Sequence, residues 1–289
     1  MAQLFKGQNI LRRLEAPMVV MLQIIPDARQ LIMVLLLCPF LGGCGADSPR
    51  SETGAANHLA PIVAQTPGRE KTPGIVRWEP VDGLPRDVAI MESVFWEPAD
   101  TDSLRQKIFN DPRLPGSTVL EIGTGSGLIS LCCLQAGAEK VVATDLNLKA
   151  IENVRFNATE MGLAKRLDAR PVPQRAPEAW TVIKPDETFD FIISNPPWEN
   201  RKPVSVEEFA LYDPDFQLLK SLVTGARTRL RPAGRMWLAY GCVTAIRRIQ
   251  EVAAEQGLSC KLLDDRSLDS LPEVFLPGML IEIRVPDAR

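Results

Sequence analysis

The residues best placed to do chemistry are those at 195–198, which read Asn-Pro-Pro-Trp. They follow 189–194, a short apolar run that is typical of a buried strand. Because proline has no N–H to donate to a sheet, the strand must end at Asn195 and a rigid loop must begin there. The corner offers an amide side chain, a carbonyl oxygen and an aromatic ring. We therefore expect it to bind a planar group that carries an NH2, at the carboxyl end of a buried strand.

A second candidate site is the glycine-rich turn 123–127. It follows a β-rich run at 118–122 and precedes a helical stretch at 128–136, an order that is typical of nucleotide binding. Asp145 ends the next predicted strand, about 20 residues past the glycines, where a carboxylate accepts hydrogen bonds from ribose hydroxyls. The alternatives are glycines used only for packing and an aspartate used only as a helix cap. The joint order of the turn, Asp145 and the corner favours a ligand site.

The elements that must position these residues alternate along the chain from Ser117. Predicted strands cover 118–122, 141–144, 166–173, 189–194, 236–240, 258–263 and 279–285. Predicted helices cover 128–136, 148–161 with Asn147 as its cap, 214–230 and 244–256, and a turn is predicted at 231–234. The alternation predicts an α/β fold with a doubly wound, mostly parallel sheet. The glycine turn, Asp145 and the Asn-Pro-Pro-Trp corner then lie on one edge of that sheet.

Composition argues against several kinds of chemistry. The chain has 289 residues and a formal net charge of −3, without the basic footprint of a tight nucleic-acid binder. Its six cysteines have no zinc-site spacing, and its one histidine, His58, lies in a Pro- and Gly-rich stretch. We therefore predict no metal site, no disulfide framework and no histidine-dependent nucleophile.

The N-terminal region has a different character. Residues 31–41 are almost all apolar, which is too short for a membrane span and typical of a signal-peptide core. Residues 41–44 resemble a bacterial lipoprotein cleavage box, in which Cys44 is the lipidated residue. A membrane anchor at Cys44 and a start codon assigned too early are both open interpretations. We predict a leader at 1–45, a Pro/Gly-rich linker at 46–87 and a catalytic domain at 88–289.

Taken together, the motifs resemble those of class I S-adenosylmethionine (SAM)-dependent methyltransferases, over about residues 94–285. Residues 121–127 resemble the first motif of that family, and Asp145 matches its ribose-binding acid. The corner matches the motif of enzymes that methylate exocyclic or amide nitrogens. Residues 94–101 resemble the cofactor-covering segment of release-factor glutamine methyltransferases and related small-domain enzymes. The resemblance implies SAM as cofactor and a Rossmann-like, seven-stranded, mostly parallel sheet with an antiparallel C-terminal strand.

The resemblance also implies roles for individual residues. The implied cofactor-binding residues are Pro98, Thr101, Glu121, Gly123, Thr124, Gly125, Gly127, Asp145 and Asn195. The implied catalytic residues are Asn195, Pro196, Pro197 and Trp198. The Asn195 side chain and the Pro196 carbonyl accept the N–H groups of the substrate, and Trp198, with Phe95 or Trp96, stacks on its plane. The acid that often holds the adenine amino group is missing after the third strand, and Gln174 is the candidate to replace it.

The expected activity is transfer of a methyl group to a planar amide or exocyclic amino nitrogen, with a protein glutamine as the first expectation. An RNA or DNA base, adenine or guanine, is the alternative acceptor, although the acidic balance favours a protein. A small-molecule amine and a catalytically inactive, membrane-tethered binding module are further alternatives. We expect a monomeric, cytoplasmic bacterial enzyme, with a lipoprotein anchored through Cys44 as the alternative.

Overall fold

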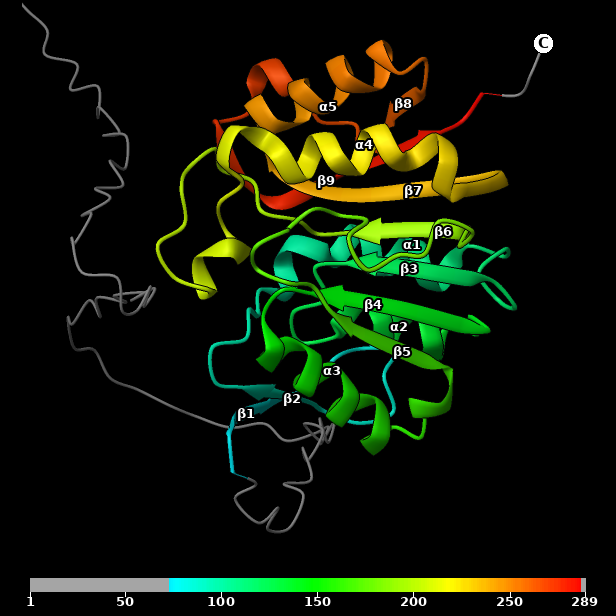
Figure 1. Ribbon diagram of the computed structural model, residues 1–289, viewed down its shortest axis with the longest axis vertical. Coiled ribbons are helices and arrows are strands. Elements are labelled where there is room, and N and C mark those ends of the chain that lie inside the picture. Colours follow the sequence, from blue (N-terminus) through cyan, green and yellow to red (C-terminus); the bar gives the residue numbers. More distant parts are fainter. Residues whose placement is uncertain (1–72, 287–289) are drawn as a thin grey trace, which may run out of the picture. The chain divides into compact units, whose positions relative to one another are not determined.

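The computed structural model describes residues 73–286, and a seven-stranded sheet forms its centre (Figure 1). The order of the strands is β5-β4-β3-β6-β7-β9-β8. They are β3 (Thr118–Ile122), β4 (Lys140–Asp145), β5 (Leu167–Pro171), β6 (Phe189–Ser194), β7 (Leu230–Cys242), β8 (Ser259–Leu262) and β9 (Val274–Arg284). Strand β9 pairs antiparallel with β7 and β8, and all other neighbouring strands are parallel. The expected doubly wound sheet with an antiparallel C-terminal strand is confirmed.

Five α-helices of the described region cover the two faces of this sheet. They are α1 (Asp102–Asn110), α2 (Leu128–Gln135), α3 (Leu148–Glu160), α4 (Gln217–Arg229) and α5 (Val243–Glu255). Successive strand residues point to opposite faces. Leu120 accordingly belongs to the core under α4 and α5, whereas its neighbour Val119 belongs to the core under α1 and α2. Because β3 pairs parallel with both β4 and β6, the carboxyl ends of these three strands lie side by side at one edge of the sheet (Figure 1).

The helix boundaries follow local signals. Asn147 caps α3, as expected, because its side-chain oxygen accepts a hydrogen bond from the Lys149 backbone N–H at 2.9 Å. Helix α4 begins at Gln217 and not at residue 214, because Asp215 and Phe216 adopt left-handed φ angles of 54° and 52°. The Asp213 carboxylate then accepts hydrogen bonds from two backbone N–H groups at the start of α4. These two hydrogen bonds satisfy backbone N–H groups that have no partner within the helix.

The predicted turn at 231–234 is wrong as a boundary, because these residues lie inside β7. Leu230 pairs with Phe189 of β6, and Arg235 pairs with Phe191. One β6 residue separates those partners while four residues separate them on β7, so the intervening chain forms a bulge. Ala233 at its tip has a φ of 62°. The Pro-Ala-Gly signal marked this bulge, which sequence reasoning took for the end of an element.

The end of the predicted linker 46–87 contains a strand. Strand β1 (Ile75–Glu79) pairs antiparallel with β2 (Val88–Met91) in a separate two-stranded sheet. Two fully buried asparagines of α3 hold the other edge of β2. Asn157 accepts a hydrogen bond from the Ala89 N–H at 2.8 Å, and Asn153 accepts one from the Met91 N–H at 2.6 Å. Both asparagines also donate to the carbonyl of Ser126, so the hairpin is tied to the glycine turn.

The predicted leader 1–45, with Cys44 and the apolar run before it, lies outside the described residues, as does His58. Between residues 73 and 286 no helix has the length and apolar character to cross a membrane. The same region contains no group of three or more His, Cys, Asp or Glu side chains arranged to hold a metal ion.

Candidate active site

The glycine turn closes tightly on the elements around it. Gly127 has a φ of 87°, and a Cβ atom there would lie 2.6 Å from Cγ2 of Val154 in α3. Gly125 has a φ of 51°, and its Cβ would lie 3.4 Å from the Phe95 carbonyl oxygen. Segment 94–101 therefore passes directly over the turn, as the resemblance implied. Glycine is needed here both for the backbone conformation and for the close approach.

Glu121 braces this turn from inside the fold. Its Oε2 accepts a hydrogen bond from the Thr124 hydroxyl at 2.7 Å and others from the Ser130 N–H and hydroxyl at the start of α2. The side chain is 2% exposed, and burial raises the pKa of Glu121 to about 7. The carboxyl therefore holds both ends of the turn and also lines the cavity beneath segment 94–101.

Asp145 lies at the carboxyl end of β4 and faces the turn. Its Oδ2 accepts a hydrogen bond from the Gly125 N–H at 2.9 Å, and its Oδ1 accepts one from the Asn147 N–H at 2.8 Å. Asn147, and not Asp145, caps α3, so the aspartate is free of the capping role considered above. Burial raises its pKa. Each carboxylate oxygen keeps acceptor capacity toward the cavity, which suits a vicinal diol.

Two adjoining cavities lie at this edge of the sheet. The larger, of about 780 Å³, is bounded by Asp145 and by apolar side chains from several loops and α4. The smaller, of about 370 Å³, is bounded by Glu97, Thr101, Glu121 and the glycine turn. The residues that line both cavities are Phe95, Gly123, Gly125 and Asn195. The larger cavity therefore suits a nucleoside and the smaller one a charged, polar group.

Asn195 lies where the two cavities meet. Strand β6 is fixed just before it, because the Ser194 hydroxyl donates to the Ile122 carbonyl at 2.6 Å. Within the described region the Oδ1 of Asn195 is buried and has no hydrogen-bond partner. Pro196 and Pro197 are buried and line the larger cavity. A buried carbonyl oxygen without a donor is costly, so its position next to a cavity marks it as a binding group.

Trp198 is placed differently from the expectation that it stacks on a substrate. Its indole N–H donates to the Ala239 carbonyl at 3.2 Å. Its ring lies where β7 and β9 carry glycine: a Cβ at Gly241 would approach Cζ3 of Trp198 to 2.4 Å. The residues that line the two cavities do not include Trp198, whereas Phe95 lines both. The ring therefore packs against the sheet, and Phe95 is the aromatic side chain at the cavity.

Of the remaining predicted residues, some line the cavities and others do not. Thr101 is buried and lines the smaller cavity. Pro98 instead borders a neighbouring hollow, and its carbonyl accepts a hydrogen bond from Arg105 at 3.3 Å. Gln174 is exposed and is not among the residues that line the larger cavity, while Glu178 of the same loop is. The strand-three replacement proposed from the sequence is therefore in the wrong place.

Sequence reasoning missed several residues of the site. Asp100 precedes Thr101 in the segment already singled out, and this adjacency was the one available signal. Val172, Ala179, Phe209 and Leu218 supply the apolar wall of the larger cavity. Val172 and Ala179 lie outside helices and strands, and Phe209 lies in a single 3₁₀ turn (Glu207–Ala210), so no periodicity marks these three residues.

Comparison with known proteins adds a family match. A family model described as "Methyltransferase small domain" matches residues 101–251. The release factor glutamine methyltransferase of Cereibacter sphaeroides is 29% identical over 186 residues, which are 60% of this chain and 62% of the relative. The protein of the same name from Rhodopirellula baltica is 31% identical over 154 residues, 49% of this chain and 50% of the relative. The chain thus spans less than two thirds of either relative.

A solved structure shares the fold. A Streptococcus mutans protein assigned as a SAM-dependent methyltransferase superposes with a TM-score of 0.52 at 16% identity, covering 74% of this chain and 56% of that chain. At this identity the similarity concerns the arrangement of sheet and helices alone.

Proposed function

Because this chain belongs to the methyltransferase small-domain family, we propose that it transfers a methyl group from SAM to the side-chain amide nitrogen of a protein glutamine. The observation that carries the proposal is the unpartnered, buried Oδ1 of Asn195 at the meeting point of the two cavities. An acceptor oxygen in that position fits a donor N–H from a substrate and has no use in the fold itself.

The residues at the edge of the sheet fit SAM. Asp145 offers acceptors to the two ribose hydroxyls, and the apolar wall of the larger cavity suits the adenine ring. Glu97 and Glu121 in the smaller cavity suit the α-ammonium of the methionine end. When bound, SAM supplies a methyl group on a positively charged sulfur. The sulfur departs as part of a neutral thioether when a nitrogen lone pair attacks the methyl carbon.

The protein contributes alignment more than acid–base chemistry. Asn195 Oδ1 and the Pro196 carbonyl accept the two N–H groups of the acceptor amide and leave its lone pair free to point toward the methyl carbon. The same two oxygens stabilise the positive charge that develops on nitrogen. The methylated nitrogen then loses this charge by releasing one of its two N–H protons to water. Holding the attacking nitrogen in line with the methyl carbon and the departing sulfur is the main source of the rate enhancement in such a displacement. Segment 94–101 passes over the glycine turn, where the Phe95 carbonyl lies against Gly125.

A protein acceptor is supported by two observations. The relatives with the name release factor glutamine methyltransferase share the sequence over much of the catalytic domain. Large apolar side chains are also exposed near the corner: Leu211, whose carbonyl accepts the Glu199 N–H, is 44% exposed, and Leu276, beside Pro98, is 56% exposed. A protein partner would bury such groups more readily than a nucleic acid would.

The test is to incubate the purified protein and its Asn195→Ala variant with methyl-labelled SAM and a bacterial lysate. We expect label in protein, at a glutamine located by a mass increase of one methyl group, and none with the variant. Label in RNA or DNA would establish the base methyltransferase instead. Absence of label from every fraction, with SAM still bound, would leave the inactive binding module.

We further propose a monomer that works in the cytoplasm, where SAM is available, with residues 1–45 as a leader and a linker that ends before β1. Mass spectrometry of the natural N-terminus tests this. A diacylated Cys44 would establish the anchored alternative, and an unmodified start downstream of it would remove the anchor.

A further inference from the structure

We propose that Asn147 is a positioning residue that holds the segment 92–97 across the cofactor site and thereby slows the release of SAM. The observation that carries the proposal is the hydrogen bond from the Asn147 side-chain NH2 to the Ser93 carbonyl at 2.9 Å. The proposal rests on the function proposed above, because it takes SAM as the ligand that the segment covers. It assigns Asn147 a task beyond its role as the cap of α3.

Segment 92–97 forms part of the wall of both cavities. Phe95 lines both of them, Ser93 lines the larger one, and Trp96 lines the smaller one. The Phe95 carbonyl lies on the glycine turn, where a Cβ on Gly125 would approach it to 3.4 Å. A cofactor that extends from one cavity into the other therefore lies against this segment.

The residues on either side of the segment are fixed, whereas those of the segment itself lie outside helices and strands. Before it, the Met91 N–H of β2 donates to Asn153 of α3 at 2.6 Å. After it, the turn Pro98–Thr101 packs on β9, because the Asp100 carbonyl would lie 2.8 Å from a Cβ on Gly278. A movement away from the cavities is therefore confined to the residues between these two fixed points.

The backbone of the segment is strained where Asn147 binds it. Ser93 has a left-handed conformation with a φ of 63°. Such a conformation is unfavourable for a residue other than glycine and persists where the surrounding contacts impose it. One of these contacts is the hydrogen bond from Asn147, and another is the turn in which the Val94 N–H donates to the Met91 carbonyl at 3.3 Å. Loss of the Asn147 bond therefore favours departure of the segment from the cavities.

Both ends of the Asn147 amide are used. Its Oδ1 accepts the hydrogen bond from the Lys149 N–H that caps α3, and its NH2 donates to the Ser93 carbonyl. A flipped amide would place NH2 against N–H and oxygen against oxygen, so the two bonds together fix one orientation. The Asn147 N–H also donates at 2.8 Å to Asp145, the carboxylate proposed to hold the ribose. One residue therefore connects the helix cap, the ribose acid and the segment over the cofactor.

Substitutions at position 147 separate the capping role from the proposed one. Serine and aspartate cap a helix about as well as asparagine, but neither has an NH2 at the position of Nδ2. Asn147→Ser leaves the Ser93 carbonyl without this donor, and Asn147→Asp places a second oxygen against it. The matched control is Lys149→Ala, at the same helix end, whose ammonium is paired with the exposed Glu152 carboxylate at 2.6 Å.

The first readout uses the free protein and needs neither SAM nor an acceptor. Hydrogen–deuterium exchange with mass spectrometry follows the backbone N–H groups of residues 92–97 and of α3. We expect exchange of segment 92–97 to be about three- to tenfold faster in Asn147→Ser and Asn147→Asp, the effect of losing one neutral hydrogen bond. Exchange of α3 should be unchanged in both variants, and Lys149→Ala should match the wild type throughout.

The second readout is the binding of SAM. Stopped-flow tryptophan fluorescence at several SAM concentrations gives the association and dissociation rate constants separately. We expect dissociation to be about three- to tenfold faster in Asn147→Ser and Asn147→Asp, with an association rate constant that is not lowered. Lys149→Ala should again match the wild type. A role in helix capping alone would change neither rate constant, because both variants keep the cap.

The two readouts together decide the proposal. Unchanged exchange of segment 92–97 in both variants overturns it even if SAM dissociates faster, because Asn147 lines the larger cavity and would then act by direct contact. Faster exchange with an unchanged SAM dissociation rate overturns it as well. If both readouts respond as expected but no acceptor is ever methylated, the role of Asn147 stands and the proposed glutamine methylation fails. A wild type that binds no SAM refutes both.

Discussion

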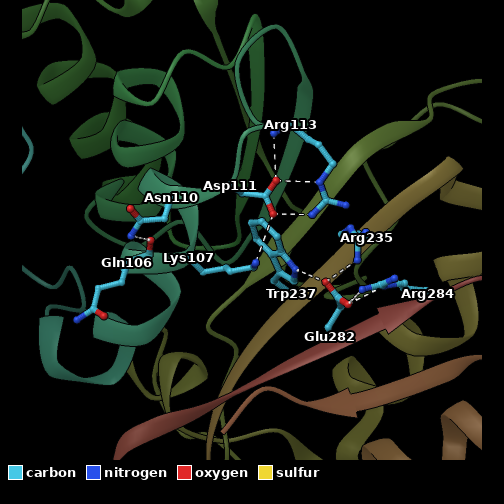
Figure 2. Close-up of polar contacts among 9 residues, drawn as sticks. All are labelled: Gln106, Lys107, Asn110, Asp111, Arg113, Arg235, Trp237, Glu282 and Arg284. Atoms are coloured by element: carbon cyan, nitrogen blue, oxygen red, sulfur yellow. Dashed lines mark hydrogen bonds and ion pairs between the residues drawn. The ribbon is translucent and has the colours of Figure 1, made fainter.

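Two pairs of buried carboxyl groups in this protein differ in whether positively charged side chains accompany them. Asp111 and Glu282, each 4% exposed, line neither cavity. Figure 2 shows both with their polar partners. Asp111 is bonded to the Arg113 guanidinium and to Lys107. Burial raises its pKa, but the Arg113 hydrogen bonds outweigh this and leave the pKa below its usual value. Glu282 accepts hydrogen bonds from Arg235 and from the Trp237 indole, each at 3.0 Å, and from Arg284.

Asp100 and Glu121 are equally buried, but Glu121 lines the smaller cavity and Asp100 directly precedes Thr101, which also lines it. The polar groups that lower the pKa of each are neutral: the Asn195 side chain for Asp100, and Thr124 and Ser130 for Glu121. Burial raises the pKa of each to about 7. The fold supplies cations where an acid only joins elements, and leaves acids without them where a ligand is to bind. Uncompensated burial next to a cavity is therefore the electrostatic mark of the site.

The largest effect is expected when the Asn195 side chain is removed. Asn195→Ala should lower kcat by about 10²–10³-fold, because it removes an acceptor that stabilises developing charge. SAM affinity should stay within about twofold, since most of both cavities is untouched. Steady-state kinetics and calorimetry measure the two quantities. An equal loss of SAM affinity would contradict this division between cofactor and acceptor contacts.

Removing a compensated acid should damage stability and leave the site intact. Glu282→Ala should lower the free energy of unfolding by about 3 kcal/mol, because it leaves buried positive charge without a partner. Urea denaturation measures this, and SAM affinity should be unchanged. The matched control is Glu251→Ala, in an exposed pair with Arg248, for which we expect a change of about 0.5 kcal/mol or less. A large loss of SAM affinity in Glu282→Ala would remove the contrast between the two pairs.

The uncompensated acids should make stability fall as pH rises. The pKa of Asp100 goes from 3.8 to about 7 on folding, so the native state is favoured while the group is protonated. That contribution is complete below pH 4 and is lost as pH rises through about 7. Asp100→Asn should therefore raise the free energy of unfolding at pH 8 by about 2 kcal/mol. Urea titrations at pH 5 and pH 8 check the slope, and a wild-type slope in Asp100→Asn would refute the assignment.

The smallest effect concerns Trp198. Trp198→Phe removes the hydrogen bond to Ala239 and should lower stability by about 1 kcal/mol. If the ring serves packing, kcat should change by no more than about threefold, roughly 0.7 kcal/mol in the barrier. A far larger fall in kcat, with stability nearly unchanged, would instead show that Trp198 leaves its slot and stacks on the acceptor.

Sequence reasoning located the parts of the site that are specified locally. The glycine turn, Asp145 and Asn195 each follow a strand, and their places at one sheet edge follow from the alternation of elements. The packing of the Asp100 carbonyl on Gly278 of β9 joins residues far apart in the chain, and no local pattern predicts it. The slot of Trp198 likewise depends on glycines in two later strands, which read as ordinary strand residues until the sheet is assembled.

The two buried asparagines of α3 have a consequence for where the catalytic unit begins. They hold β2 on one edge while β1 holds it on the other, and they also bind Ser126 of the glycine turn. A protein shortened to start at residue 88, the domain boundary drawn from composition, would strip β2 of its pairing strand and loosen the anchor of the turn. The shortest chain that preserves the conformation of the glycine turn must therefore begin upstream of Ile75. That upstream stretch carries none of the residues assigned to methyl transfer.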